Sequence, residues 1–138
     1  LMSLGIPLNT DSTLKGQTVF LAERCGELMH DNIITDRTIL DVMAFTMNAK
    51  SIPYQDKEAF ETYASEFIRE YDYIFYISPH GLEIEDNGVR ETDEHYRDLI
   101  DFTITTLIKR HGHKAGAIEK ISGSTEERIQ QILNVTKL

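Results

Sequence analysis

Residues 32–45 read NIITDRTILDVMAF, and this stretch decides the fold class that we predict. Two adjacent isoleucines in residues 32–35 predict a short buried strand, and a helix-length apolar segment follows at 38–48. Asp36 and Arg37 lie between them. Because ligands of an open parallel sheet bind beyond the carboxyl ends of its strands, Asp36 would face a bound ligand. The alternative is that Asp36 only caps the next helix, since aspartate is a favoured N-cap residue.

The composition is that of an ordinary soluble domain. The 138 residues suffice for a real core, so we expect a single domain over 1–138. No apolar run approaches the roughly 20 residues that cross a bilayer, so we expect no membrane partner. Cys25 is the only cysteine, which excludes an intrachain disulfide and favours a reducing, cytoplasmic location. Its place in an apolar stripe predicts a packing residue and not a reactive thiol.

The formal net charge of −9 argues against extended nucleic acid as a partner, because a phosphate backbone would be repelled. A small phosphorylated ligand is compatible with this charge. A few well-placed arginines and a bound cation can reverse the local field whatever the total charge is.

A helical period precedes the stretch at 32–45. At residues 13–29, apolar side chains recur every three or four positions, which predicts an amphipathic helix. Gln17, Glu23 and Arg24 lie off the apolar face. They either form a solvated face or overlook the ligand crevice.

The helix predicted at 38–48 is apolar nearly all round, so we expect it to be buried. Asp41 is the exception, and an unpaired carboxylate removed from water is strongly destabilising. Arg37 lies one helical turn earlier and is the local candidate for its partner. Such a pair is either structural or faces the ligand.

The rest of the chain continues the alternation of helices and strands. Asp56 is the predicted N-cap of a helix to about residue 71, and a capping box of Ser124 and Glu127 predicts the last helix. The acidic segment 82–93 predicts an exposed loop. The remaining predicted elements are strands at 73–77 and 115–121 and a helix at 93–110.

This succession of elements predicts a parallel α/β sheet covered by helices. The segment IITDRTILDVMAF resembles the strand-Asp-Arg-helix segment of P-loop nucleoside and nucleotide kinases, including AAA-type ATPase domains related to ribosylnicotinamide kinase. YIFYISP resembles their next core strand, EDNGVRETDEHYR their arginine-bearing lid, and SGSTEERI their last unit. The resemblance implies a three-layer α/β/α sheet with a lid at about 82–97.

The resemblance also implies roles for single residues. Asp36 would hold Mg²⁺ or act as the base, and Arg37 would contact the acceptor or its phosphate. Arg90 and Arg97 would be lid arginines that close over the transferring phosphoryl group, because a fixed guanidinium stabilises its charge. The turn that would border the nucleotide base consists of Ser122, Gly123 and Ser124.

One motif of this family is missing from the sequence. There is no G-x-x-x-x-G-K-[ST] loop, which cradles the phosphates in P-loop proteins. In the family this loop follows a first strand that lies between the strands matching 32–35 and 73–77. Loss of that strand would leave about 5 hydrogen bonds unmade on each side, at about 1 kcal/mol each. We therefore expect that the sequence lacks roughly 40 or more N-terminal residues, the scale of a βαβ unit and its connection.

The expected function of the intact protein is ATP-dependent phosphoryl transfer to a nucleoside, nucleotide or similar small acceptor, with ATP and Mg²⁺ as cofactors. The 138 residues alone would be inactive. One alternative is a nucleotide-binding, ATPase- or GTPase-like sensor module that phosphorylates no metabolite. Another is a non-catalytic interaction protein that has lost its phosphate loop. The acceptor and a homodimeric state stay open.

Overall fold

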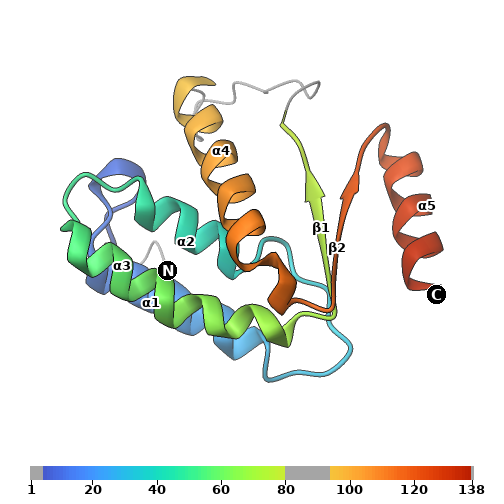
Figure 1. Ribbon diagram of the computed structural model, residues 1–138, viewed down its shortest axis with the longest axis horizontal. Helices are drawn as coiled ribbons and strands as arrows, with labels where there is room; N and C mark the ends of the chain where they lie inside the picture. Colours follow the sequence, from blue (N-terminus) through green and yellow to red (C-terminus); the bar gives the residue numbers. More distant parts are fainter. Residues whose placement is uncertain (1–4, 80–93, 138) are drawn as a thin grey trace.

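Helices make up most of this computed structural model, which describes residues 5–79 and 94–137 (Figure 1). β1 and β2 form a two-stranded parallel sheet, so the fold is mixed α/β and mostly helical. In chain order the elements are η2 (Asn9–Asp11), α1 (Leu14–Glu27), α2 (Ile39–Met47), α3 (Tyr54–Ser65), η3 (Glu66–Glu70), β1 (Tyr73–Ile77), α4 (Glu94–His111), η4 (Gly112–Lys114), β2 (Ala117–Ile121) and α5 (Thr125–Thr136).

Capping boxes start two of the helices. Ser124 and Glu127 form the predicted box at the start of α5, where the Glu127 N–H donates to Ser124 Oγ at 3.1 Å. Thr38 and Asp41 form the box at the start of α2. Thr38, and not Asp36, is therefore the N-cap of α2, and the capping alternative for Asp36 is wrong.

The predicted N-cap at Asp56 is also wrong, because α3 begins at Tyr54, directly after Pro53. The proline ring restricts φ to a value compatible with a helix start, and Pro53 has a φ of −59°. Asp56 lies in the first turn, where a carboxylate still interacts favourably with the helix dipole. The predicted helix that ends near residue 71 is observed as α3 followed by η3.

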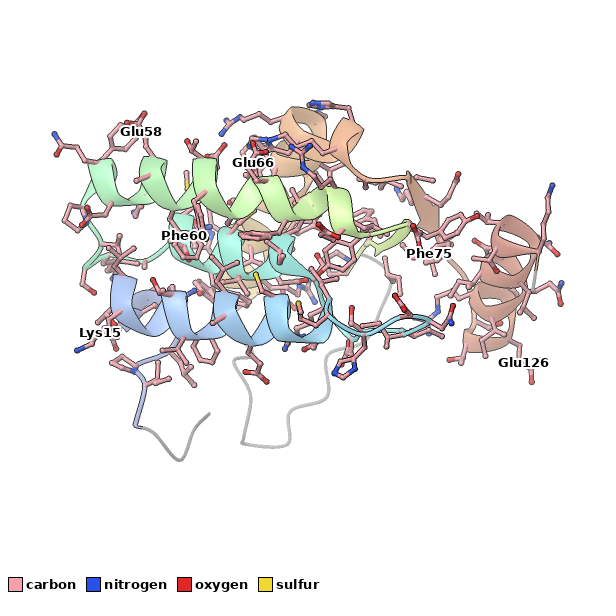
Figure 2. The ribbon with its side chains drawn as sticks, turned by 90° about the horizontal axis from the view of Figure 1, so that it is seen from below. Lys15, Glu58, Phe60, Glu66, Phe75 and Glu126 are labelled. Atoms are coloured by element: carbon pink, nitrogen blue, oxygen red, sulfur yellow. The ribbon has the colours of Figure 1, made fainter. Side chains whose placement is uncertain are left out.

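The core is built around α2, which contacts α1, α3 and α4. Ile39, Met43 and Ala44 are 0% exposed, so the predicted burial of this helix is confirmed. Figure 2 shows Phe60 on the side of α3 that faces α1, and its side chain is buried. Burial of each large apolar side chain stabilises the fold by about 1.5–3 kcal/mol. Cys25 packs against this core, as predicted.

Both predicted strands at 73–77 and 115–121 are confirmed as β1 and β2. They pair in parallel from Tyr73 with Ala117 to Ile77 with Ile121. α4 connects them, and Figure 1 shows α4 beside β1 and α5 beside β2, on opposite sides of the strand pair. The two strands and α4 thus form one βαβ unit.

Gly116, just before β2, permits a close approach of two backbones. Its N–H donates to the Tyr71 carbonyl oxygen at 3.0 Å. A Cβ at this position would lie 2.4 Å from the carbonyl oxygen of Asp72, which is far inside van der Waals contact. Only glycine fits here without a backbone shift.

Residues 32–35 form no strand, so this prediction is wrong. Ile34 is 96% exposed and Ile33 is 42% exposed. Asn32 has a φ of 55°, a left-handed conformation that interrupts an extended segment. A strand needs a neighbour for its backbone groups, and within the described ranges β1 pairs with β2 alone. Without a partner strand, this apolar segment stays a loop.

The sheet is therefore smaller than the one that the resemblance implies, and helices supply most of the core. A helix satisfies its backbone hydrogen bonds internally, whereas each strand depends on a neighbour. This difference explains why the helices predicted on either side of residues 32–35 are present although the strand between them is not.

Candidate functional site

A cavity of about 260 Å³ lies between the N-terminal segment, α1 and α2. Its wall combines apolar side chains with a few polar and charged ones, as is usual for small-molecule sites. The apolar residues are Leu8, Phe20, Val42 and Phe45, and the polar ones are Ser12, Gln17, Arg24, Arg37, Thr38 and Asp41.

Arg37 lies in the wall of this cavity, and its contact with an acceptor stays a prediction. Its φ is 77°, a left-handed conformation that costs a residue with a Cβ atom about 1–2 kcal/mol. The Thr35 hydroxyl donates to the Arg37 carbonyl oxygen at 2.9 Å and stabilises this turn. The Arg37 guanidinium carbon lies 5.9 Å from the centroid of the Phe45 ring, within the range of a cation–π interaction.

Arg24 brings a second guanidinium group to the same cavity from α1. Its side chain is 22% exposed, and Nη1 lies 2.8 Å from Glu27 Oε1. Nη1 also donates to the carbonyl oxygen of Asp36 at 3.2 Å. Arg24 thereby ties α1 to the turn before α2 and also lines the cavity, so it does not belong to a purely solvated helix face.

Gln17 is buried, so the prediction of a solvated face is wrong for this residue. Its Nε2 donates to Thr46 Oγ1 at 3.0 Å and to the Val42 carbonyl oxygen at 3.4 Å. Glu23, in contrast, is exposed. The sequence placed both residues off the apolar face of α1, and only the packing of α1 against α2 separates their environments.

The Asp41 carboxylate is held by the backbone and not by the predicted ion pair with Arg37. Oδ2 accepts a hydrogen bond from the Thr38 N–H at 2.7 Å. Burial raises the pKa of Asp41 above its ordinary value, although this hydrogen bond and the positive charges of Arg37 and Arg24 act in the opposite direction. Among the described residues, two guanidinium groups and one carboxyl group line the cavity, which gives this part of the wall an excess of positive charge.

Asp36 lies outside this cavity and is exposed. It contributes instead to a neighbouring open depression that Arg24, Glu27 and His30 also line. Within residues 5–79 and 94–137, no group of three or more His, Cys, Asp or Glu side chains is arranged to hold a metal ion. The role of Asp36 as a Mg²⁺ ligand or base stays a prediction.

Arg97 and the turn at residues 122–124 do not line the cavity. Arg90 lies outside the described residues, as does most of the predicted lid. Arg97 lies in the first turns of α4, where its Nε is buried without a hydrogen-bond partner and is 3.8 Å from Asp98 Oδ1.

The turn between β2 and α5 contains the residues predicted to border a nucleotide base. Gly123 has a φ of 97°, and Ser124 caps α5. Gln131 holds the turn, because its side-chain amide bonds both the N–H and the carbonyl oxygen of Ser122. All three turn residues are exposed.

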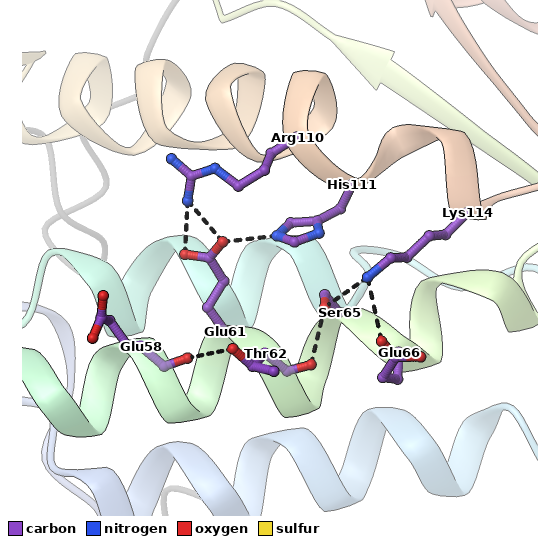
Figure 3. A network of polar contacts seen from close by, with 8 residues as sticks. All are labelled: Glu58, Glu61, Thr62, Ser65, Glu66, Arg110, His111 and Lys114. Atoms are coloured by element: carbon purple, nitrogen blue, oxygen red, sulfur yellow. Dashed lines mark hydrogen bonds and ion pairs between the residues drawn. The ribbon is translucent and has the colours of Figure 1, made fainter.

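A second polar cluster joins α3 to the end of α4 (Figure 3). Glu61 accepts hydrogen bonds from Arg110 at 2.7 and 2.9 Å and lies 2.7 Å from His111 Nε2. Burial raises the pKa of Glu61, but the hydrogen bonds from Arg110 and His111 outweigh it and leave the pKa below its ordinary value. Because these charges satisfy each other, we interpret the cluster as structural.

Comparisons with known proteins find no matching protein-family model, no matching curated protein and no matching solved structure. Across the described ranges, no helix combines the length and the apolar content needed to pass through a membrane.

Proposed function

We propose that the intact protein transfers the γ-phosphoryl group of ATP to a nucleoside, a nucleotide or a similar small acceptor, and that the α1–α2 cavity binds the acceptor. The observation that carries this proposal is the conformation of Arg37. Its backbone is left-handed, yet its guanidinium lies in the cavity wall together with that of Arg24. Backbone strain of this kind clusters at functional sites, where the surrounding structure enforces it.

A larger parallel sheet of the P-loop kinase type, three-layered and with a further strand between β1 and residues 32–35, is part of the proposal. Two observations support it. Among the described residues β1 has only one partner strand, and Ile33 and Ile34 are exposed although they are strongly apolar. A strand in this place would provide hydrogen-bond partners for β1 and would cover both isoleucines.

We assign to the described residues the binding of the acceptor and the removal of the proton from its hydroxyl group. Arg37 and Arg24 would hold an anionic group of the acceptor. Asp36 directly precedes Arg37 but lies outside the cavity, so its carboxylate would receive the proton of an acceptor hydroxyl that extends out of the cavity. Arg97 has a buried Nε that no described residue hydrogen-bonds, with Asp98 Oδ1 at 3.8 Å, which is compatible with a role on an anion.

The described residues alone do not form a binding site for the phosphoryl donor, ATP–Mg²⁺. ATP would supply the phosphoryl group and Mg²⁺ would neutralise its charge. The described residues contain no cluster of metal ligands, and the sequence contains no phosphate loop. The proposed contacts of Asp36, of Arg90 and of the turn at residues 122–124 with ATP–Mg²⁺ therefore depend on the larger sheet.

The test is a coupled assay of ADP formation by the intact protein, with ATP–Mg²⁺ and a panel of nucleosides and nucleotides. We expect Asp36→Ala to abolish transfer, and Asp56→Ala, which removes a carboxylate from the first turn of α3, to leave transfer intact. Near-normal turnover of Asp36→Ala would reject the role of Asp36. Binding or hydrolysis of ATP without any phosphorylated acceptor would favour the sensor alternative, and no binding of ATP–Mg²⁺ would favour the interaction protein.

A further inference from the structure

The charge of the α1–α2 cavity is opposite to that of the chain. The sequence carries a formal net charge of −9, but among the described residues the cavity wall contains two arginines, Arg24 and Arg37, and one acidic residue, Asp41. These two guanidinium groups come from different elements, namely α1 and the turn before α2. Such convergence creates a local positive field that attracts an anion despite the total charge.

Arg37 is the cation with donors to spare. Arg24 already contacts Glu27 and the Asp36 carbonyl oxygen. Arg37 makes no ion pair with any of the described acidic residues, and its guanidinium lies over the Phe45 ring. A guanidinium carries five N–H donors in a planar fork, which suits two parallel hydrogen bonds to a phosphate or carboxylate.

The aromatic side chains in the same cavity wall suit a flat apolar group. Phe20 and Phe45 both line it, and each is only partly buried by the protein. Aromatic side chains bind planar rings by offset stacking or by edge-to-face contact. The volume of about 260 Å³ lies just below the roughly 300–1,000 Å³ of common ligand sites, so it suits one small ligand and excludes a dinucleotide.

We propose that this cavity binds a small aromatic ring bearing one anionic group, with a phosphate or carboxylate on Arg37 and Arg24 and the ring against Phe20 and Phe45. This inference deepens the proposed function because it names the acceptor class. Binding itself needs neither ATP nor phosphoryl transfer, so the two proposals can fail separately.

The test is calorimetric titration of the intact protein, without ATP, against four probes. Phenyl phosphate and benzoate carry both a ring and an anionic group, whereas inorganic phosphate and benzyl alcohol each carry one of the two. We expect one of the aromatic anions to bind at least ten times more tightly than either single-feature probe. The tighter of the two aromatic anions identifies the anionic group as phosphate or carboxylate.

Variants assign the binding to this cavity. Arg37→Gln should weaken the preferred aromatic anion at least tenfold, whereas Arg69→Gln, which removes an exposed arginine of η3, should leave affinity unchanged. Asp41→Asn removes the one acidic side chain that the described residues contribute to the wall and should tighten binding several-fold. Phe45→Leu keeps the apolar volume but should abolish the preference for the ring over inorganic phosphate.

Three results would overturn this inference. The first is that neither aromatic anion binds. The second is that inorganic phosphate binds as tightly as phenyl phosphate. The third is that Arg37→Gln binds the aromatic anion as tightly as the unmodified protein does. Circular dichroism checks the fold of each variant, and if Arg37→Gln does not fold, the outcome with Phe45→Leu decides. Tight binding of an aromatic anion together with no phosphoryl transfer would reject the proposed function and retain this site.

Discussion

Replacement of Arg37 by glycine and by alanine measures the backbone strain on which the proposed function depends. The φ of 77° at Arg37 costs a residue with a Cβ atom about 1–2 kcal/mol, whereas glycine adopts it freely. Alanine keeps this strain and loses the contact with Phe45, which is worth about 0.5–1 kcal/mol because Arg37 is exposed. We therefore expect Arg37→Ala to destabilise the protein slightly.

Arg37→Gly loses the same contact and also pays the larger entropy of an unfolded glycine, about 0.5–1 kcal/mol. Relief of the strain offsets this loss, so Arg37→Gly should be more stable than Arg37→Ala by about 0.5–1 kcal/mol. Urea denaturation at constant m-value measures the difference. Both variants should lose aromatic-anion binding, because both lack the guanidinium.

The control pair is Arg69→Gly and Arg69→Ala. Arg69 lies in the 3₁₀ helix η3, has a negative φ and is exposed. There alanine should be the more stable variant by about 0.5–1 kcal/mol, so the order of the two variants reverses between the two positions. An Arg37→Gly variant that is no more stable than Arg37→Ala would refute strain at this residue and with it the main support for the proposed function.

The remaining predictions concern the structural cluster and the exposed isoleucines. Glu61→Gln should destabilise the protein by about 1–3 kcal/mol, measured by urea denaturation, because it weakens charge-assisted hydrogen bonds from Arg110 and His111. The folded-state pKa of Glu61 lies below the ordinary value of 4.5. The stabilisation by the ionised Glu61 carboxylate is therefore fully present above pH 4.5 and is lost as the pH falls through the folded-state pKa. Glu61→Gln should lack this part of the pH dependence of stability. Ile34→Asp should destabilise the intact protein by more than 1 kcal/mol, roughly the loss of a buried apolar side chain, if a further strand covers this 96% exposed residue. A thermal unfolding midpoint within experimental error of the unmodified protein would reject that strand.

Local chemistry was enough to predict most of the secondary structure. The capping box of Ser124 and Glu127, the apolar helix at 38–48 and the strand at 73–77 each appear where the sequence places them. Caps and hydrophobic periodicity act over one or two turns, so they can be recognised without knowledge of the fold. The N-cap of α3 was predicted at Asp56, whereas the helix begins at Tyr54, so this prediction is wrong by only a few residues.

The site depended on contacts between distant segments. Arg37 was predicted to face a ligand, but the residues that line the cavity together with Arg37 are brought there by the packing of α1 on α2. That packing places Arg24 beside Arg37, buries Gln17 and leaves Glu23 in solvent, although the sequence pattern treats all three α1 residues alike. For Asp41 the sequence offered an arginine as the partner, and the capping geometry of α2 provided the Thr38 N–H instead.

Residues 32–35 separate what the local sequence determines from what only the tertiary structure determines. Their sequence establishes that they are apolar and that a helix follows them, and both statements hold. Whether they become a strand depends on a neighbour that can satisfy their backbone N–H and carbonyl groups. Helices and their caps arise from residues close in the chain, whereas a sheet and a cavity exist only between segments that folding brings together.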